Sequence, residues 1–511
     1  MENGDSPVRP NGDVVYLSLE GKRALSISPS DDFLTLYEPI PKNKLRSACR
    51  SIVTDASGKR RVPLYNILWI EASNGHLCID YAAHASKTSI KLEKWTFALI
   101  KGNESPGGQV PEEFAANILA RAYGDSQLRK RAYVLINPHA GPGGALRKWS
   151  SDVKPLFDAA RMSLDVVTLK RGGEAVGLAE KVDIDKYDTI MACSGDGTPH
   201  EIFNGLAKRP DASRALAKIA VSHIPCGSGN AMSCNLYGSY RPSFAALAII
   251  KGIVMPLDLV SITQGDRRLV SFLSQSLGIV AESDLGTEHL RWMGGSRFEV
   301  GVLMRIFRRR CYPCDVAVKV EVGDKNDIKA HYKRHTSDAG IKQPSVAATT
   351  GHDNSKGLPE LKYGTVNGPL PDGWELIKYD KIGNFYCGNM AYMAPDANFF
   401  SAAVASDGCM DLVTVNGDLS PITATKLLYS VESGKFFDNP HVQYKKISAY
   451  RITPRDQKDG YISIDGERIP FEPFQAEIHQ GLGRVISKRG IFEAAGPTDW
   501  DKVKLADRLH A

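Results

Sequence analysis

The stretch Ser194-Gly195-Asp196-Gly197-Thr198-Pro199-His200-Glu201 decides the fold. It directly follows the apolar run Thr189-Ile190-Met191-Ala192-Cys193, which is typical of a strand buried on both faces. Thr198 and Pro199 suit the first turn of a helix, and Phe203 continues the apolar face of that helix. A buried strand that turns through glycines into a helix is typical of an open α/β sheet, which binds ligands at the carboxyl ends of its strands.

The two glycines beside Asp196 favour a phosphate site. Glycine lets the backbone approach a phosphate closely, and a helix N-terminus offers unpaired N–H groups and the positive end of a dipole. A carboxylate in that place would repel an anion unless a metal intervenes, so Asp196 fits better as a base or as an organiser of Mg²⁺. This combination indicates phosphoryl transfer.

Two further glycine-rich turns follow predicted strands, one from Asn137 to Ala145 and the other from Pro225 to Ala231. The first is neither GxGxxG nor a P-loop, and alone it would be an ordinary tight turn. Because the carboxyl ends of parallel strands meet at one edge, the three loops together predict a nucleotide site. The residues that we expect to contact the nucleotide in these two turns are Asn137, Pro138, His139, Gly141, Gly143, Gly227, Ser228, Gly229 and Asn230.

The pattern of elements predicts an α/β class followed by β structure. Residues 15–102 read as a series of strands with a turn at Ser73-Asn74-Gly75, and a helix follows from Pro111 to Tyr123. Residues 131–260 alternate between strand and helix, which predicts a parallel, doubly wound sheet, and an antiparallel β-rich domain follows. The expected parts are an N-terminal β-rich extension at 1–128 with 1–14 disordered, a nucleotide-binding domain at 129–256, a β-rich domain at 257–495 with a disordered insertion at about 323–373, and a tail at 496–511.

Composition narrows the class of protein only slightly. The net charge of +6 suits anionic nucleotides or anionic lipid surfaces, and a slightly basic soluble protein equally well. The sequence predicts no secretory signal and no membrane-spanning helix, and the nine cysteines read as reduced thiols in the cytoplasm. Cys311 and Cys314 have CxxC spacing, but no second pair completes a zinc site.

The order NPxxGxGxA, SGDGxxHExxNGL and PxGSGNA resembles the diacylglycerol-kinase-type catalytic domain, and specifically the sphingosine (long-chain base) kinases. The resemblance covers about residues 130–320 and 385–490. It implies ATP and Mg²⁺, a sphingoid base as lipid substrate, and a β-sandwich-like lipid-binding domain. NAD kinases share the fold and the Gly-Asp-Gly-Thr motif, but Gly227-Ser228-Gly229-Asn230-Ala231 and the segment around Asp284 resemble the lipid kinases.

The resemblance also implies roles for individual residues. Asp284 matches the acidic residue that recognises the polar head of the base, and Asp196 matches the base that accepts the proton of the lipid hydroxyl. Mg²⁺ would be organised by Asp196 and Glu467. The residues expected to contact the nucleotide on this ground are Thr168, Lys170, Arg171, Glu201, Arg291, Arg297, Asp465, Gly466 and Glu467, and those expected to contact the lipid are Ser194, Gly195, Asp196, Gly197, Ser274 and Asp284.

An apolar slot is expected for the lipid tail. The candidate lining residues are Leu273, Leu277, Ile279, Val280, Val300, Leu303, Met304, Ile306 and Phe307. The segment 298–307, followed by Arg308-Arg309-Arg310, reads as an amphipathic, basic-flanked element that would contact an anionic membrane peripherally. We expect no nucleic-acid partner, and a homodimer is compatible with the sequence. The alternatives are a ceramide or diacylglycerol kinase and, outside the enzymes, a lipid-sensing scaffold with a degenerate site.

Overall fold

The computed structural model describes residues 15–19, 23–37, 59–99, 110–286, 296–337 and 357–505, with side chains described from 301 onward in the helix that begins at 296. The chain forms two compact units. Unit 1 comprises Met1–Lys130, Trp149–Ser163 and Ala246–Lys251, and unit 2 comprises Arg131–Lys148, Leu164–Ala245 and Gly252–Ala511.

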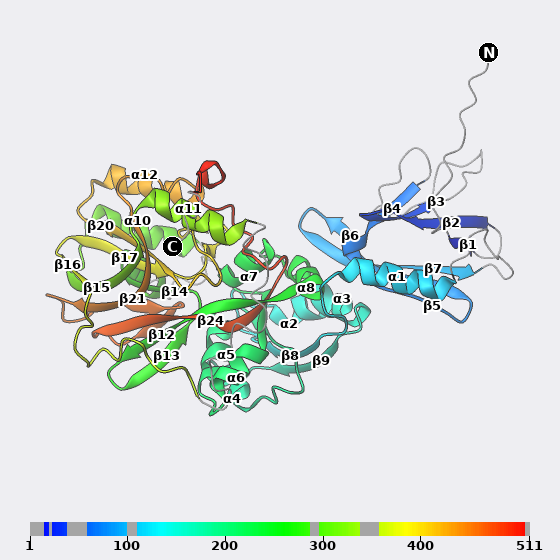
Figure 1. Cartoon of the computed structure of the whole chain (residues 1–511), viewed down its shortest axis with the longest axis horizontal. Coiled ribbons are helices and arrows are strands. Elements are labelled where there is room, and N and C mark those ends of the chain that lie inside the picture. The colour runs from blue at the N-terminus through cyan, green and yellow to red at the C-terminus, as the bar shows by residue number, and fades with distance from the viewer. Residues whose placement is uncertain are drawn as a thin grey trace, which may run out of the picture. The chain divides into compact units, whose positions relative to one another are not determined.

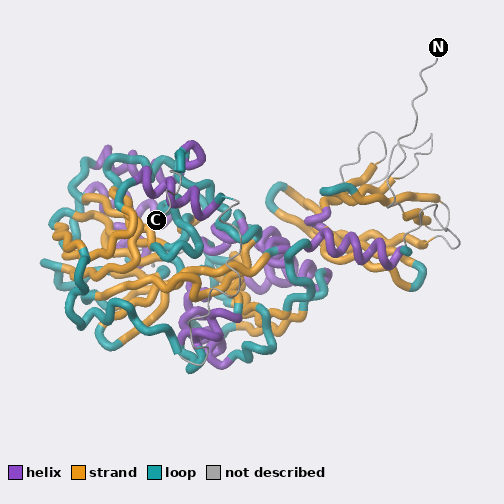
Figure 2. The backbone as a smooth tube through the Cα atoms, in the orientation of Figure 1, coloured by secondary structure: helices purple, strands orange, loops and turns teal. Residues whose placement is uncertain are grey.

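Unit 1 contains a seven-stranded antiparallel sheet with helix α1 (Pro111–Tyr123) packed on β5 (Figure 2). The strand order is β4-β3-β2-β1-β7-β6-β5. The strands are β1 (Val15–Leu19), β2 (Arg23–Pro29), β3 (Phe33–Tyr37), β4 (Lys59–Pro63), β5 (Ile67–Ser73), β6 (His76–Ser86) and β7 (Ser89–Leu99). The predicted turn is confirmed, because Asn74 and Gly75 both have positive φ values between the paired residues Ser73 and His76. Strands β3 and β4 were not predicted.

Unit 2 is built around parallel strands whose order confirms the predicted α/β class. The neighbours β8 (Arg131–Ile136), β10 (Thr189–Ser194) and β11 (Ala220–Pro225) run parallel, and β9 (Ser163–Thr168) lies beside β8. Strands β10 and β11 are buried along their whole length, as their apolar sequences predict. The helices of this half are α2 (Ala145–Lys148), α4 (Glu174–Lys181), α5 (Gly197–Ala207), α6 (Ala212–Lys218) and α7 (Ala231–Tyr237). Helix α3 (Lys154–Ala159) belongs to unit 1, and α8 (Pro242–Lys251) begins in unit 2 and continues into unit 1 at Ala246.

The other half of unit 2 is antiparallel and continues the same sheet. Strand β24 (Phe474–Ser487) pairs parallel with β11 and antiparallel with β12 (Ile253–Gln264) along most of its length, and it runs through the middle of the unit in Figure 1. The sheet therefore continues from the parallel strands into the antiparallel ones through β24. The remaining strands are β13 (Arg267–Ser271), β14 (Ser274–Gly278), β15 (Cys314–Val322), β16 (Glu375–Tyr379), β17 (Ile382–Gly388), β18 (Tyr392–Ala394), β19 (Ala397–Asn398), β20 (Met410–Asn416), β21 (Gln443–Pro454), β22 (Ile462–Ile464) and β23 (Glu467–Ile469).

Four helices accompany these strands: α9 (Ile279–Leu285), α10 (Ser296–Phe307), α11 (Lys325–Thr336) and α12 (Pro421–Glu432). Helix α11 corrects the expectation of disorder for residues 325–336 of the predicted insertion at 323–373, of which residues 338–356 lie outside the described residues. The Asp324 side chain caps this helix by accepting hydrogen bonds from the N–H groups of Asn326 and Asp327, and Ile328 and Tyr332 are buried one turn apart. Two apolar positions in a polar run were too few to show the helix in the sequence. Among the described residues, no helix is long and apolar enough to cross a membrane.

Candidate active site

The three predicted loops meet at the carboxyl ends of β8, β10 and β11. A Cβ atom added to Gly227 would lie 2.5 Å from the Cα of Gly195, and one added to Gly141 would lie 2.8 Å from the carbonyl oxygen of Cys226. The Asn137 N–H donates to the carbonyl oxygen of Cys193 (3.0 Å), and the Cys226 N–H donates to that of Ser194 (2.7 Å). Glycine is needed at these positions because the loop backbones touch. We call this region the glycine-loop edge.

Asp196 lies at the centre of the glycine-loop edge, and its carboxylate caps helix α7. Oδ2 accepts a hydrogen bond from the Ala231 N–H and Oδ1 accepts one from the Met232 N–H, both at 3.0 Å. Its side chain is 15% exposed. The position of the carboxylate is therefore set by the third loop and its helix as well as by the Gly-Asp-Gly turn itself.

Helix α5, which follows Asp196, contacts the neighbouring elements α4 and β13 through residues of the same motif. Glu201 accepts hydrogen bonds from the Gly173 and Ala175 N–H groups, both at 3.0 Å, and so caps helix α4. Asn204 exchanges hydrogen bonds with the backbone of Val270 in β13. A Cβ atom on Gly205 would lie 2.3 Å from the Val176 carbonyl oxygen, so α4 packs directly on α5. The structure thus places Glu201 as the residue that fixes the loop after β9, where Thr168, Lys170 and Arg171 are exposed.

The Asp-Gly-Glu turn at 465–467 lies beside the Gly-Asp-Gly loop, with Glu467 Oε1 3.1 Å from a Cβ atom added to Gly197. It joins β22 to β23, with positive φ values at Asp465 and Gly466. The Asp465 side chain is completely buried. It accepts hydrogen bonds from the N–H groups of Phe272, Leu273 and Ser274, the Ser271 hydroxyl and His200 Nδ1. With every direction occupied, this carboxylate holds the turn against β13 and β14.

His200, within the same motif, had no predicted role. Its Nδ1 lies 2.8 Å from Asp465 Oδ2, so it links α5 to the Asp-Gly-Glu turn. Burial acts to lower the pKa of His200, but the hydrogen bond and charge of Asp465, with Glu467 and Glu201, outweigh it and raise that pKa. The motif spacing contained no signal for this contact because the partner lies 265 residues away.

Glu467 and Asp284 complete the group of carboxylates around the edge. Glu467 is exposed, and its Oε1 would lie 3.1 Å from a Cβ atom on Gly197. Asp284, on α9, has an Oδ2 atom that would lie 3.8 Å from a Cβ atom on Gly466. Tyr386 is buried beside Asp284. Burial raises the pKa of its phenol, the charge of Asp284 raises it further, and a hydrogen bond with Ser274 lowers it in part. The fold thus brings together Asp196, Glu467 and Asp284 from three distant segments.

Carboxylate oxygens such as these are the ligands that Mg²⁺ prefers. The exposed carboxylate of Glu467 fits as a ligand, since it lies beside the Gly197 backbone and no described residue forms a hydrogen bond or ion pair with it. Both oxygens of Asp196 already accept amide hydrogen bonds, which fits an organising role through water better than direct coordination.

The other predicted residues divide into those outside the described part of the chain and those with a different structural position. Arg291 lies outside the described residues, and Arg297 lies in α10 where side chains are not described. Of the lining candidates, Leu277 belongs to the hydrophobic core of the antiparallel half and Ile279 packs against it. Met304 and Phe307 on α10 are 44% and 69% exposed, so they face outward from the protein surface.

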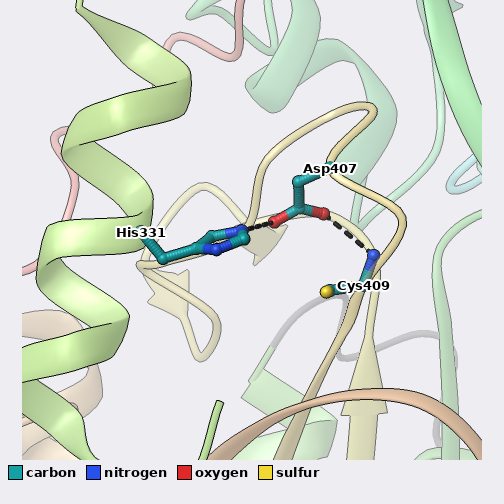
Figure 3. Close-up of side chains that lie close together, drawn as sticks. All are labelled: His331, Asp407 and Cys409. Carbon is teal, nitrogen blue, oxygen red and sulfur yellow. Dashed lines mark hydrogen bonds and ion pairs between the residues drawn. The ribbon is translucent and has the colours of Figure 1, made fainter. Parts of the chain in front are cut away.

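A second cluster of potential metal ligands lies in the antiparallel half (Figure 3). His331 Nε2 lies 2.9 Å from Asp407 Oδ2, and the Cys409 N–H donates to Asp407 Oδ1. However, the buried ammonium of Lys446 lies 2.7 Å from Asp407 and 3.1 Å from Asp411. A cation is thus already in place, and we interpret this group as a buried charge cluster that stabilises the fold.

Comparison with known proteins gives the family. Residues 131–262 match the family model described as the diacylglycerol kinase catalytic domain, and residues 16–124 match a domain of unknown function, DUF7493. Sphingoid long chain base kinase 4 of Schizosaccharomyces pombe is 31% identical over 434 residues, which span 84% of this chain and 89% of that protein. The chain belongs to the sphingoid long chain base kinase family.

Other relatives agree with this assignment. Sphingoid long chain base kinase 5 of Saccharomyces cerevisiae is 34% identical over 77% of this chain, although the match spans 64% of that longer protein. Among solved structures, a diacylglycerol kinase of Bacillus anthracis aligns with 70% of this chain and 97% of its own, with 19% identity and a TM-score of 0.46. That likeness is too distant to carry an argument. The family accounts for the position of the three glycine loops inside the matched domain, and as a kinase family it implies ATP as co-substrate.

Proposed function

We propose that this chain transfers the γ-phosphoryl group of ATP to the primary hydroxyl of a sphingoid long-chain base. The observation that supports the proposal is the meeting of Asp196, Glu467 and Asp284 at the glycine-loop edge. An acidic group beside a phosphate-type site suits a substrate with a cationic amine and a nearby hydroxyl. The two yeast relatives described above are named sphingoid long chain base kinases, which supports a sphingoid base as the substrate.

In this mechanism Asp196 accepts the proton of the lipid hydroxyl as the new O–P bond forms and the bond to ADP breaks. Its amide hydrogen bonds to α7 orient the carboxylate before the reaction begins.

The nucleotide would lie along the glycine-loop edge. Backbone N–H groups of the loops at 137–143 and 227–230 would donate to phosphate oxygens where they have no acceptor within the protein. Pro138 and Pro142 have no N–H, and those of Asn137, His139, Ala140, Gly143 and Gly227 already donate to other atoms of the loops and strands. Lys170 and Arg171 are exposed at the adjacent strand end, and Arg291 and Arg297 are assigned to the γ-phosphoryl charge by the resemblance. Glu467 would hold Mg²⁺ with the phosphates, and the ion would supply neutralisation of their charge.

Asp284 would select the substrate. A charge-assisted hydrogen bond to a 2-amino group favours a sphingoid base, whereas a diacylglycerol or ceramide has no cationic amine to form it. The antiparallel half, including Leu273 and Ser274, would contain the lipid site. A ceramide or diacylglycerol kinase is the alternative that a substrate experiment must separate.

The decisive experiment incubates the purified chain with Mg²⁺-ATP and a mixture of sphingosine, ceramide and diacylglycerol, and identifies phosphorylated products by mass. We expect the 1-phosphate of the free base to dominate, and an Asp284→Asn variant to lose that preference. Phosphorylation of ceramide or diacylglycerol instead would refute the substrate, and the absence of any lipid phosphate would refute the activity.

Contact with an anionic membrane is part of this proposal. Helix α10 exposes Met304 and Phe307 and is followed by the exposed Arg308 and Arg309, and α12, in contact with α10, exposes Ile422 and Tyr429. Replacing Met304 and Phe307 by Glu should reduce sedimentation with anionic vesicles and leave activity on detergent-dispersed base intact. Unchanged sedimentation would contradict the contact.

A further inference from the structure

The imidazole of His223 lies directly behind Asp196 in strand β11. Its side chain is completely buried, and its Nδ1 lies 3.9 Å from Asp196 Oδ1. The sequence provided no reason to select it, since it is a single histidine within a buried strand. Of the buried polar atoms in the described part of the chain, His223 Nδ1 is one of the few without a hydrogen-bond partner. A buried polar atom with no partner is costly and calls for a reason.

The other ring nitrogen settles the tautomer. His223 Nε2 lies 2.9 Å from the carbonyl oxygen of Ser194, which can only accept, so Nε2 carries the proton. Burial lowers the pKa of His223 more than the charge of Asp196 raises it, so the ring is neutral. Nδ1 is therefore a bare lone pair that faces Asp196.

While Asp196 is ionised, two acceptors face each other, and 3.9 Å is too long for a hydrogen bond. The relation reverses once Asp196 takes a proton on Oδ1, because the new O–H can donate to Nδ1. A closure of about 1 Å would bring the pair to ordinary hydrogen-bond distance. Asp196 Oδ1 and His223 Nδ1 attract each other only after the proton has moved to Asp196. An interaction that is stronger in the transition state than in the ground state lowers the activation barrier.

We propose that His223 is a positioning residue that accepts a hydrogen bond from protonated Asp196 during phosphoryl transfer. The substrate O–H bond breaks and its proton passes to Asp196 Oδ1, the substrate oxygen forms its bond to the γ-phosphorus, and ADP leaves with the electron pair of the broken P–O bond. His223 stays neutral throughout. This inference rests on the proposed role of Asp196 as base.

Two substitutions separate the ring nitrogens. His223→Gln places an amide donor near the position of Nε2, which keeps the contact to Ser194, and removes the acceptor at Nδ1. His223→Asn places an amide oxygen near Nδ1 and loses the Nε2 donor. Tyr237→Phe is the matched control, because the Tyr237 hydroxyl accepts from the His223 backbone N–H (3.2 Å) and touches neither ring nitrogen.

We expect His223→Gln to lower kcat by about 10- to 100-fold, at the lower end of the range for proton-transfer partners, with unchanged KM for ATP and for the base and an unchanged unfolding temperature. His223→Asn should recover most of that kcat, and Tyr237→Phe should match the wild type. A wild-type kcat in His223→Gln overturns the inference, and so does an equal loss in the Gln and Asn variants. If the Gln variant does not fold, the Asn variant decides, since a large loss of kcat there contradicts the role of the acceptor.

The failure of this inference differs from failure of the proposed function. A wild-type chain inactive on every lipid, or an active Asp196→Asn variant, would refute the function or its base. An active wild type, an inactive Asp196→Asn variant and an unaffected His223→Gln variant would refute the role of His223 alone.

Discussion

Two regions of unit 2 bury acidic groups, and they do so in different ways. In the buried charge cluster, Asp407 and Asp411 share the ammonium of Lys446, so the counter-charge comes from within the protein. At the glycine-loop edge, Asp196 and Asp465 are held by backbone N–H groups, and no lysine or arginine of the described residues forms an ion pair with either. At Asp196 the amides fix the carboxylate without neutralising it, so its charge remains available to a proton or a metal, whereas Asp465 is also paired with His200.

The pKa shifts follow the same division. In the cluster, burial raises the pKa of Asp411 to about 6 despite Lys446, whereas Lys446 and His331 overcome burial and lower the pKa of Asp407. These shifts describe a closed set of charges that serves stability. Proximity of acidic groups and burial alone therefore do not identify an active site, and the source of the counter-charge is the better guide.

The largest expected effect is on kcat, after substitution of Asp196 at the glycine-loop edge. Asp196→Asn keeps an acceptor for α7 but removes the charge and the base, so kcat should fall by about 10²- to 10⁴-fold. The loss of stability should stay near 1 kcal/mol, as for a weakened helix cap. The rate of phosphate transfer to sphingosine measures kcat, and thermal unfolding measures the loss of stability. Activity near the wild-type level would show that the carboxylate is structural, like those of the cluster.

In the buried charge cluster, we expect a substitution to reduce stability strongly. Lys446→Met leaves two buried carboxylates without their cation, and we expect a loss of about 3–5 kcal/mol in the free energy of unfolding. The control is Lys381→Met, because Lys381 pairs with Asp418 on the surface and solvent-exposed pairs contribute little to stability. Denaturant unfolding compares them. Equal small losses in both variants would show that the cluster is not held by its charges.

Backbone contact between the loops gives a third test. Gly227→Ala puts a methyl group against the Gly195 backbone, and overpacking of about 1–3 kcal/mol should weaken ATP binding by about 10-fold or more. Gly172→Ala is the control, since nothing lies within 4 Å of its added Cβ and its φ is not positive. Titration with ATP reads out both. An unchanged affinity for Gly227→Ala would mean that the nucleotide does not depend on this contact.

The smallest effect concerns pH. The folded-state pKa of His200 is raised above its ordinary value of 6.5 by Asp465, so the contact stabilises the fold fully below that value. The contribution is lost as pH rises through the folded pKa. His200→Gln should therefore be destabilised more at pH 5.5 than at pH 8.5, as measured by unfolding at both. An equal difference at the two values would show that His200 is neutral in the fold.

Prediction from the sequence succeeded where the signal was local. The buried run at 189–193, the turn at 73–75 and the glycine loops each carry their conformation in adjacent residues, and all are confirmed. It failed where partners are distant in the sequence. Helix α11 was read as disorder, and the contacts of Glu201 with α4 and of Asp465 with His200 were not foreseen.

The sequence by itself determined the strand that ends in Ser194-Gly195-Asp196-Gly197, the loops on either side and the family of the chain, because each depends on residue types at fixed local spacing. The tertiary structure alone decided which carboxylates are held by amides and which by a lysine, and it alone placed His223 behind Asp196. Such relations depend on which strands become neighbours, and local residue patterns do not specify that.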